Sequence, residues 1–233
     1  MIALSRFQIA GYLRSLRALH PLIVVALLLI LVMQDGPSGP QAKDLATGSL
    51  GDVAAFLLPI GAWATRALLD TQPDVQRDLS ALSVCAGQGG RSTPALADLL
   101  AGYVINLCLA ALLLAFPLLQ GLVVGVDPLV VLTGIVLSLL VAAAATVLGA
   151  WTSRAVIPSP AVSLLTLLGG SVAILLFSLG PLKWLSIPMV GWLRAAHHGP
   201  DAFVSALPTM ALHIAIWSAV VGLGYVLVRR QRA

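Results

Sequence analysis

The run ALADLLAGYVINLCLAALLLAFPLL, residues 95–119, is the stretch of sequence that decides the fold. Asp98 is its only charged residue. An α-helix rises about 1.5 Å per residue, so ~20 apolar residues cross the ~30 Å hydrocarbon core of a bilayer. The run is longer than that and therefore predicts a membrane-spanning helix.

Apolar runs on both sides of this segment predict further spans. They cover residues 19–33, 52–69, 128–151, 155–179 and 203–228. The first run is shorter than the ~20 residues that a bilayer core requires, so we expect the helix before it to contribute. It has no small-residue cleavage site and precedes the other runs, which argues against a cleaved signal peptide. The sequence thus predicts an all-α membrane protein with six transmembrane helices in a single transmembrane domain, residues 1–233.

Composition excludes a soluble globular domain. The chain is 59% hydrophobic and 9% charged, with a mean hydropathy of +1.01. A soluble domain carries roughly 25% charged residues. The isoelectric point near 9.6 is accompanied by a net charge of only +4. On a membrane chain such a charge favours a role of the basic residues in topology, and we expect no nucleic-acid partner.

The basic residues are distributed unevenly between the two sides that the spans define. Ten of the thirteen fall on the side that holds the N-terminus: Arg6, Arg14, Arg17, Arg66, Arg77, Arg91, Arg154, Arg229, Arg230 and Arg232. The remaining three are Lys43, Lys183 and Arg194. Short cytoplasmic loops are enriched in Lys and Arg, so we expect both termini to be cytoplasmic, in a multi-pass protein of the inner (plasma) membrane.

The N-terminal segment, residues 1–19, has the pattern of an amphipathic helix. Its apolar residues share one helical face and its arginines fall away from that face. The apolar residues are Ile2, Ile9, Leu13 and Leu16. We expect a helix that lies in the membrane interface, and the alternative is a basic start to the first span.

A long polar connection, residues 66–98, separates the second and third spans. Within it, Thr71, Pro73 and Asp74 are helix-start signals, and apolar residues then follow at i, i+4 and i+7. These apolar residues are Val75, Leu79 and Leu82, with Arg77, Asp78 and Ser80 on other faces. A lone helix of about ten residues is marginal in water, so this one, residues 74–84, needs a surface to rest on.

The same connection contains a glycine cluster, residues 87–90, which ends that helix before Thr93 and Pro94 start the next one. No Lys-Ser or Lys-Thr pair follows the cluster and no strand precedes it, so a hinge is favoured over a phosphate-binding loop. Cys85 and Cys108 lie in different environments, and we expect both to be structural.

The external segment, residues 180–206, combines aromatic and basic residues with apolar ones. We expect short re-entrant or surface helices there, with Trp184 and Trp192 at the membrane interface. The adjacent pair His197 and His198 lacks a third ligand at a familiar spacing, so no metal site is predicted. His213 is the only ionisable residue well inside a span, where a helix–helix hydrogen bond is favoured over a proton relay.

The order of these features resembles the type-2, exporter-like permease subunit of ATP-binding cassette transporters. The stretch GGRSTPALADLL, residues 89–100, is similar to that family's re-entry from the coupling helix into the third span. The resemblance implies that residues 70–93 are the coupling region and residues 74–84 the helix that docks on a separate ATPase. The implied contact residues are Asp74, Val75, Arg77, Asp78, Leu79 and Leu82.

The same resemblance implies the partners and the mechanism. Two permease subunits, identical or different, enclose the pathway, and two ATPase subunits bind ATP and Mg. The chain has no G-x-x-x-x-G-K-[ST] motif, so it is expected to be neither an enzyme nor a carrier of any cofactor. The alternative is a six-span protein of another type: an ion-coupled carrier, an intramembrane enzyme, or an immunity or assembly protein. The cargo is left open.

Overall fold

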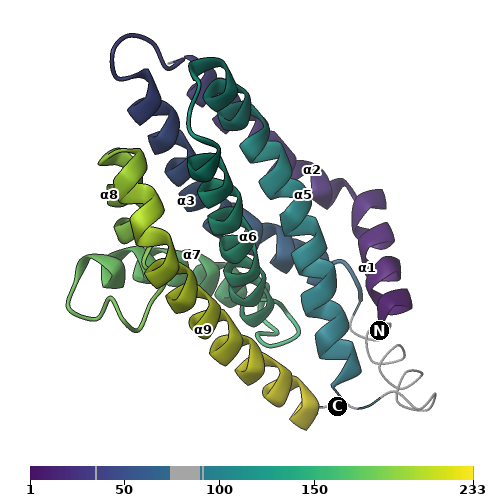
Figure 1. Ribbon diagram of the computed structural model, residues 1–233. Helices are drawn as coiled ribbons and strands as arrows, with labels where there is room; N and C mark the ends of the chain where they lie inside the picture. The colour runs from purple at the N-terminus through teal and green to yellow at the C-terminus, as the bar shows by residue number, and fades with distance from the viewer. Residues whose placement is uncertain (35, 74–89, 91, 233) are drawn as a thin grey trace.

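The computed structural model describes residues 1–34, 36–73, 90 and 92–232, and within these ranges every regular element is helical. Figure 1 shows the arrangement, with N- and C-terminal ends at the same end of the bundle. The elements are α1 (Ile2–Arg14), η1 (Leu16–Ala18), α2 (Leu19–Gln34), α3 (Ala42–Leu69), α5 (Thr93–Val124), α6 (Pro128–Trp151), α7 (Pro160–Leu179), α8 (Met189–His197) and α9 (Pro200–Arg232). The predicted all-α class is confirmed.

Five of the described helices are long and apolar enough to cross a membrane, namely α3, α5, α6, α7 and α9. A sixth span arises if residues 2–14 and 16–31 are counted together, although these two parts are bent by 80°. The bend occurs where Ser15 adopts an extended backbone conformation. The chain is therefore a multi-pass membrane protein with five spans, or six if the bent N-terminal pair is counted as one.

The interior of the bundle is built around α3, which packs on α5 and α6. Small residues bring these helices close together. A Cβ on Gly102 of α5 would lie 2.7 Å from Cγ2 of Thr65, and a Cβ on Gly149 of α6 would overlap the carbonyl oxygen of Ala62. The most apolar part of α3 is 72% buried, whereas the corresponding parts of α7 and α9 are only 17% buried. The helices α7 and α9 therefore present most of their apolar surface outward.

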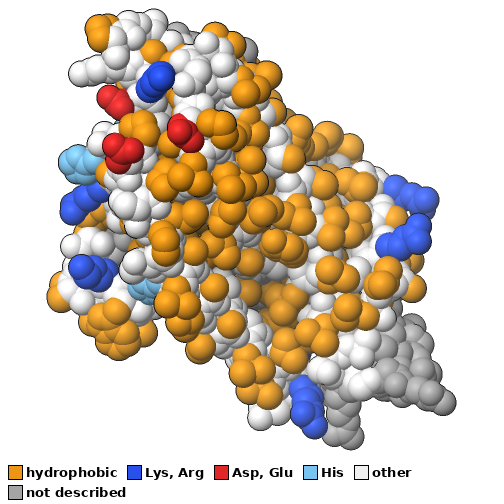
Figure 2. Space-filling view, viewed as in Figure 1, with side chains coloured by type: hydrophobic (Ala, Val, Ile, Leu, Met, Phe, Trp, Pro, Cys, Tyr) orange, Lys and Arg blue, Asp and Glu red, His pale blue; other side chains and the backbone are white. Residues whose placement is uncertain are grey.

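The molecular surface reflects this arrangement. Figure 2 shows a broad apolar band across one face, with the Lys, Arg and Asp side chains at its margins. Among the described residues visible in this view, the acidic side chains gather at the end that carries α8 in Figure 1. Such a band with charged margins is the surface that a bilayer requires.

Two helices start at other positions than the sequence predicts. Helix α3 begins at Ala42 rather than near residue 52, because its polar first turns pack on α8. A Cβ on Gly51 would lie 2.6 Å from the Cβ of Ala196, so this approach is close. Helix α7 begins at Pro160 rather than at 155, since the residues preceding Pro158 and Pro160 are pushed away from helical geometry.

Residues 180–199 hold one short helix, α8, in which Trp192 is fully buried. The expectation that Trp192 lies at the membrane interface is therefore wrong, because the side chain fills the space between packed helices. Trp184 is exposed, as an interfacial residue would be.

Helix α1 turns an unexpected face toward the bundle. Ser5, Gln8 and Tyr12 are its buried residues, whereas Ile2 and Leu13 of the apolar face are exposed. Ile2, Leu13 and Leu16 thus point away from the protein, where lipid can cover them, whereas Ile9 packs against the core.

Candidate functional site

The two ends of the connection between α3 and α5 are each surrounded by charged and polar side chains. The predicted coupling residues themselves lie outside the described residues: Asp74, Val75, Arg77, Asp78, Leu79 and Leu82. Their role stays a prediction. The residues that hold the two ends of the connection are described, and they form two clusters.

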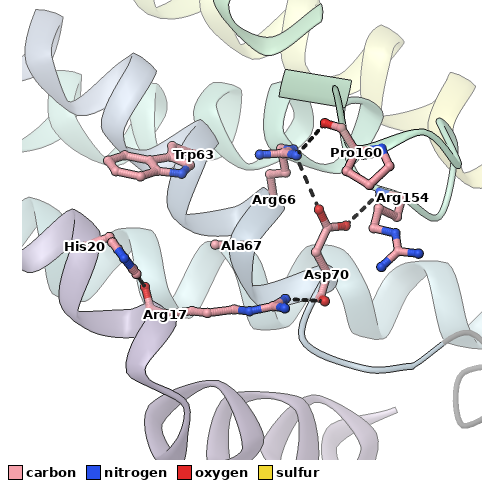
Figure 3. Close-up of a pocket in the computed structure, with 8 residues that line it drawn as sticks. All are labelled: Arg17, His20, Trp63, Arg66, Ala67, Asp70, Arg154 and Pro160. Atoms are coloured by element: carbon pink, nitrogen blue, oxygen red, sulfur yellow. Dashed lines mark hydrogen bonds and ion pairs between the residues drawn. The ribbon is translucent and has the colours of Figure 1, made fainter. Parts of the chain in front are cut away.

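The first cluster lies at the end of α3. Trp63, Arg66, Ala67 and Asp70 follow at i, i+3, i+4 and i+7, a spacing that places them on one face of the helix. With neighbouring residues they line a pocket of about 330 Å³, called here the basic pocket (Figure 3). The other lining residues are Arg17 of η1 and His20 of α2, and Arg154 and Pro160, which border the link from α6 to α7.

Asp70 connects three parts of the chain in this pocket. Its Oδ1 accepts a 2.7 Å hydrogen bond from the backbone N–H of Arg154, and its Oδ2 lies 3.6 Å from Nε of Arg66. Arg17 donates from Nη1 to the carbonyl oxygen of Asp70 at 2.6 Å. The end of α3 is thus held by η1 on one side and by the residues after α6 on the other.

Arg66 extends the cluster to α7. Its Nε donates to Oγ of Ser163 at 2.5 Å, and its Nη2 donates to the carbonyl oxygen of Pro160 at 3.2 Å. The hydroxyl of Ser163 in turn donates to the carbonyl oxygen of Thr152. A single guanidinium therefore fixes the first turn of α7 against the end of α3.

The basic pocket has an excess of positive charge. Three arginines and one aspartate line it, which gives a net charge of +2 with His20 neutral. His20 and Trp63 form a tilted ring pair with centroids 6.3 Å apart. Guanidinium groups are suited to carboxylates and phosphates, so the pocket has the chemistry of an anion site.

The second cluster surrounds Asp98, the single charge in the run that predicts the third span. Asp98 is only 5% exposed. Its Oδ1 accepts a 2.7 Å hydrogen bond from Nε2 of Gln8, and its Oδ2 accepts one of 2.9 Å from the hydroxyl of Tyr225. Nη2 of Arg229 lies 3.6 Å from the same Oδ2. The start of α5 is therefore tied to both α1 and α9.

A neutral polar group lies deeper in the bundle. Nδ2 of Asn106 is 2.9 Å from the hydroxyl oxygens of both Thr65 and Thr146, which joins α5 to α3 and α6. All three residues are buried. The network supplies buried acceptors to the amide nitrogen of Asn106.

The predicted histidines lie outside both clusters. Nε2 of His197 is 3.0 Å from Oδ1 of Asp52, and the two side chains are partly exposed. Nε2 of His213 is 3.1 Å from the carbonyl oxygen of Trp184, so its partner belongs to the loop after α7 and not to another helix. Among the described residues no three His, Cys, Asp or Glu side chains form a group that could hold a metal ion.

The sequence contains a signal for each cluster, and each signal rests on charged residues, which apolar periodicity does not show. The face formed by residues 63, 66, 67 and 70 is one such signal. The other is the position of Asp98 inside an otherwise uncharged apolar run, since charge in such a run requires partners. The partners Gln8 and Tyr225 lie too far away in sequence to be identified from it.

Comparisons of the chain with protein-family models, with curated proteins and with solved structures find no match. A functional proposal therefore depends on the spans and on the two clusters.

Proposed function

We propose that this chain is the membrane-spanning permease subunit of an ATP-driven exporter, coupled to a separate ATPase through residues 70–93. The observation that carries the proposal is that both ends of this connection are held by charged clusters, around Asp70 and around Asp98. In this role two permease subunits form the pathway, and two ATPase subunits bind ATP and Mg.

The clusters give a physical route from the connection to the spans. A displacement at Asp70 acts on η1 through Arg17 and on the start of α7 through Arg66. A displacement at Asp98 acts on α1 through Gln8 and on α9 through Tyr225. A partner that grips residues 70–93 differently in its ATP-bound and ATP-free states would thereby shift most of the bundle.

The packing of the interior favours a pathway between two subunits. The helices α3, α5 and α6 approach so closely at Gly102 and Gly149 that cargo has no room between them. The helices α7 and α9 keep broad apolar faces outward. We therefore assign the pathway to the space between two permease subunits, with lipid on the remaining outward faces.

The uneven distribution of basic residues supports the orientation that this role requires. An ATPase in the cytoplasm reaches residues 70–93 only if the C-terminal end of α3 and the N-terminal end of α5 face the cytoplasm. These ends lie on the side where ten of the thirteen basic residues fall, the side that the positive-inside rule assigns to the cytoplasm.

Association with an ATPase tests the proposal. The chain is co-expressed with candidate ATP-binding cassette ATPases of its own genome, and complexes are purified by a tag on the permease. The double substitution Leu79→Asp, Leu82→Asp is expected to abolish co-purification, because two carboxylates replace the predicted apolar docking face. Ser80→Asp, which adds a charge to another face of the same segment, is the matched control and is expected to retain the ATPase. Undiminished recovery with the double variant would overturn the assignment.

A further inference from the structure

We propose that the basic pocket binds the phosphate group of an anionic phospholipid headgroup. This inference does not depend on the ATPase, because it concerns residues 17–20, 63–70 and 154–160 alone. It assigns a ligand to the excess positive charge of the pocket, which the exporter role does not use.

The pocket has the charge and the size for a phosphate group. Its lining has a net charge of +2 with His20 neutral, and its volume of about 330 Å³ lies within the ~300–1,000 Å³ of small-molecule sites. The guanidinium groups of Arg17 and Arg66 border this space, where they also donate to carbonyl oxygens of the protein (Figure 3). Guanidinium forms paired hydrogen bonds with phosphate oxygens. A zwitterionic headgroup also carries a phosphate, but its net attraction to a positively charged pocket is lower.

The position of the pocket favours a lipid over free phosphate. Among the described residues, α2 and α7 each pack on α3 and not on each other, so α3 forms the floor between them. The first two turns of both flanking helices carry exposed apolar side chains: Ile23 on α2, and Val162 and Leu165 on α7. Acyl chains attached to a bound phosphate would find apolar surface beside it.

The aromatic residues mark the depth of the site. Trp63 lines the pocket beside His20, and tryptophan is enriched where hydrocarbon meets headgroups. One helical turn further along α3 the lining becomes charged, at Arg66 and Asp70. A phosphate at the level of the arginines would thus lie at headgroup depth, and basic pockets between spans on the cytoplasmic side bind anionic headgroups in this way.

A direct test uses residues 1–233, purified and transferred to nanodiscs of equimolar phosphatidylglycerol and phosphatidylcholine. Native mass spectrometry after release from the discs measures the fraction of protein that retains each lipid. Wild-type protein is expected to retain phosphatidylglycerol in preference to phosphatidylcholine. Arg17→Gln is expected to lower phosphatidylglycerol retention about fivefold, the effect of one basic residue near an anionic lipid. Arg14→Gln, an exposed arginine outside the pocket, removes the same charge and is expected to leave retention unchanged.

A second variant separates loss of binding from loss of folding. Ala67 lines the pocket, and its side chain makes no polar contact that a substitution would remove. Ala67→Glu places a carboxylate among the arginines, so it is expected to displace the lipid while the protein stays monodisperse in gel filtration. Retention that is unaffected by both Arg17→Gln and Ala67→Glu would overturn the proposal.

The source of the phosphate is tested in the same preparation. Addition of millimolar inorganic phosphate is expected to leave the retained lipid in place, since free phosphate lacks the acyl chains. Displacement of the lipid by inorganic phosphate, or equal retention of phosphatidylcholine, would contradict an anionic phospholipid site.

Discussion

At the scale of single residues, the charged side chains near the membrane are held by partners that lie far away in sequence. Asp98 is the clearest case, because its carboxylate is buried between side chains of α1 and α9. A buried carboxylate costs several kcal/mol unless it is paired and hydrogen-bonded. Its neighbours in turn depend on it as their acceptor.

Substitution of Asp98 by Ala is therefore expected to destabilise the folded protein by about 3 kcal/mol, because Gln8 and Tyr225 lose an acceptor and Arg229 a counter-charge. Thermal unfolding in detergent, followed by gel filtration of the heated protein, measures this change. Asp201→Ala removes an exposed aspartate at the start of α9 and is expected to have little effect. An Asp98→Ala variant as stable as the Asp201→Ala control would show that the cluster does not hold the helices together.

What the sequence predicts at this scale is limited. Arg17, Arg66 and Arg154 are recognisable as basic residues of one membrane side, but their meeting at Asp70 depends on how η1 and the end of α6 approach α3. Such an approach is set by packing between distant segments. The hydrophobic pattern contains no information about it.

At the scale of elements, apolar length predicts the spans well and their ends poorly. The hydrocarbon thickness sets a minimum length, so the runs at 95–119 and 128–151 are easily found. Helix α3 begins ten residues before its predicted start, because α8 covers its polar first turns. The start of α3 is thus determined by a tertiary partner and not by the membrane.

The crossing of α3 and α6 is the element contact with the least tolerance for added volume. Gly149→Ala is expected to cost about 1–3 kcal/mol, because the new Cβ overlaps the backbone of Ala62, which has little freedom to move. Gly169→Ala on α7 adds the same methyl group where no atom lies within 4 Å, and is expected to be neutral or slightly stabilising. Thermal unfolding of the two variants in the same detergent compares them. Equal stability of both would mean that α3 and α6 do not cross as closely as described.

At the scale of the whole molecule, the chain is a helical membrane protein whose charge distribution predicts its orientation. Fusion of green fluorescent protein to the C-terminus is expected to give fluorescent cells, because the reporter folds in the cytoplasm. The same reporter inserted after Gly39, in the connection before α3, is expected to give no fluorescence, because it would be exported unfolded to the other side of the membrane. The reverse pattern would place the basic pocket on the outer side and contradict both proposals.

The exporter role is the central claim at this scale, and it requires that residues 70–93 transmit work between the spans and an ATPase. The charged clusters at the ends of this segment supply the attachment. The measurement that tests this most directly is Mg-dependent ATP hydrolysis by the co-purified complex in nanodiscs. The account predicts hydrolysis with wild-type chain and with Ser80→Asp, and none above background with Leu79→Asp, Leu82→Asp. Equal hydrolysis by all three preparations, or none by the wild type, would contradict it.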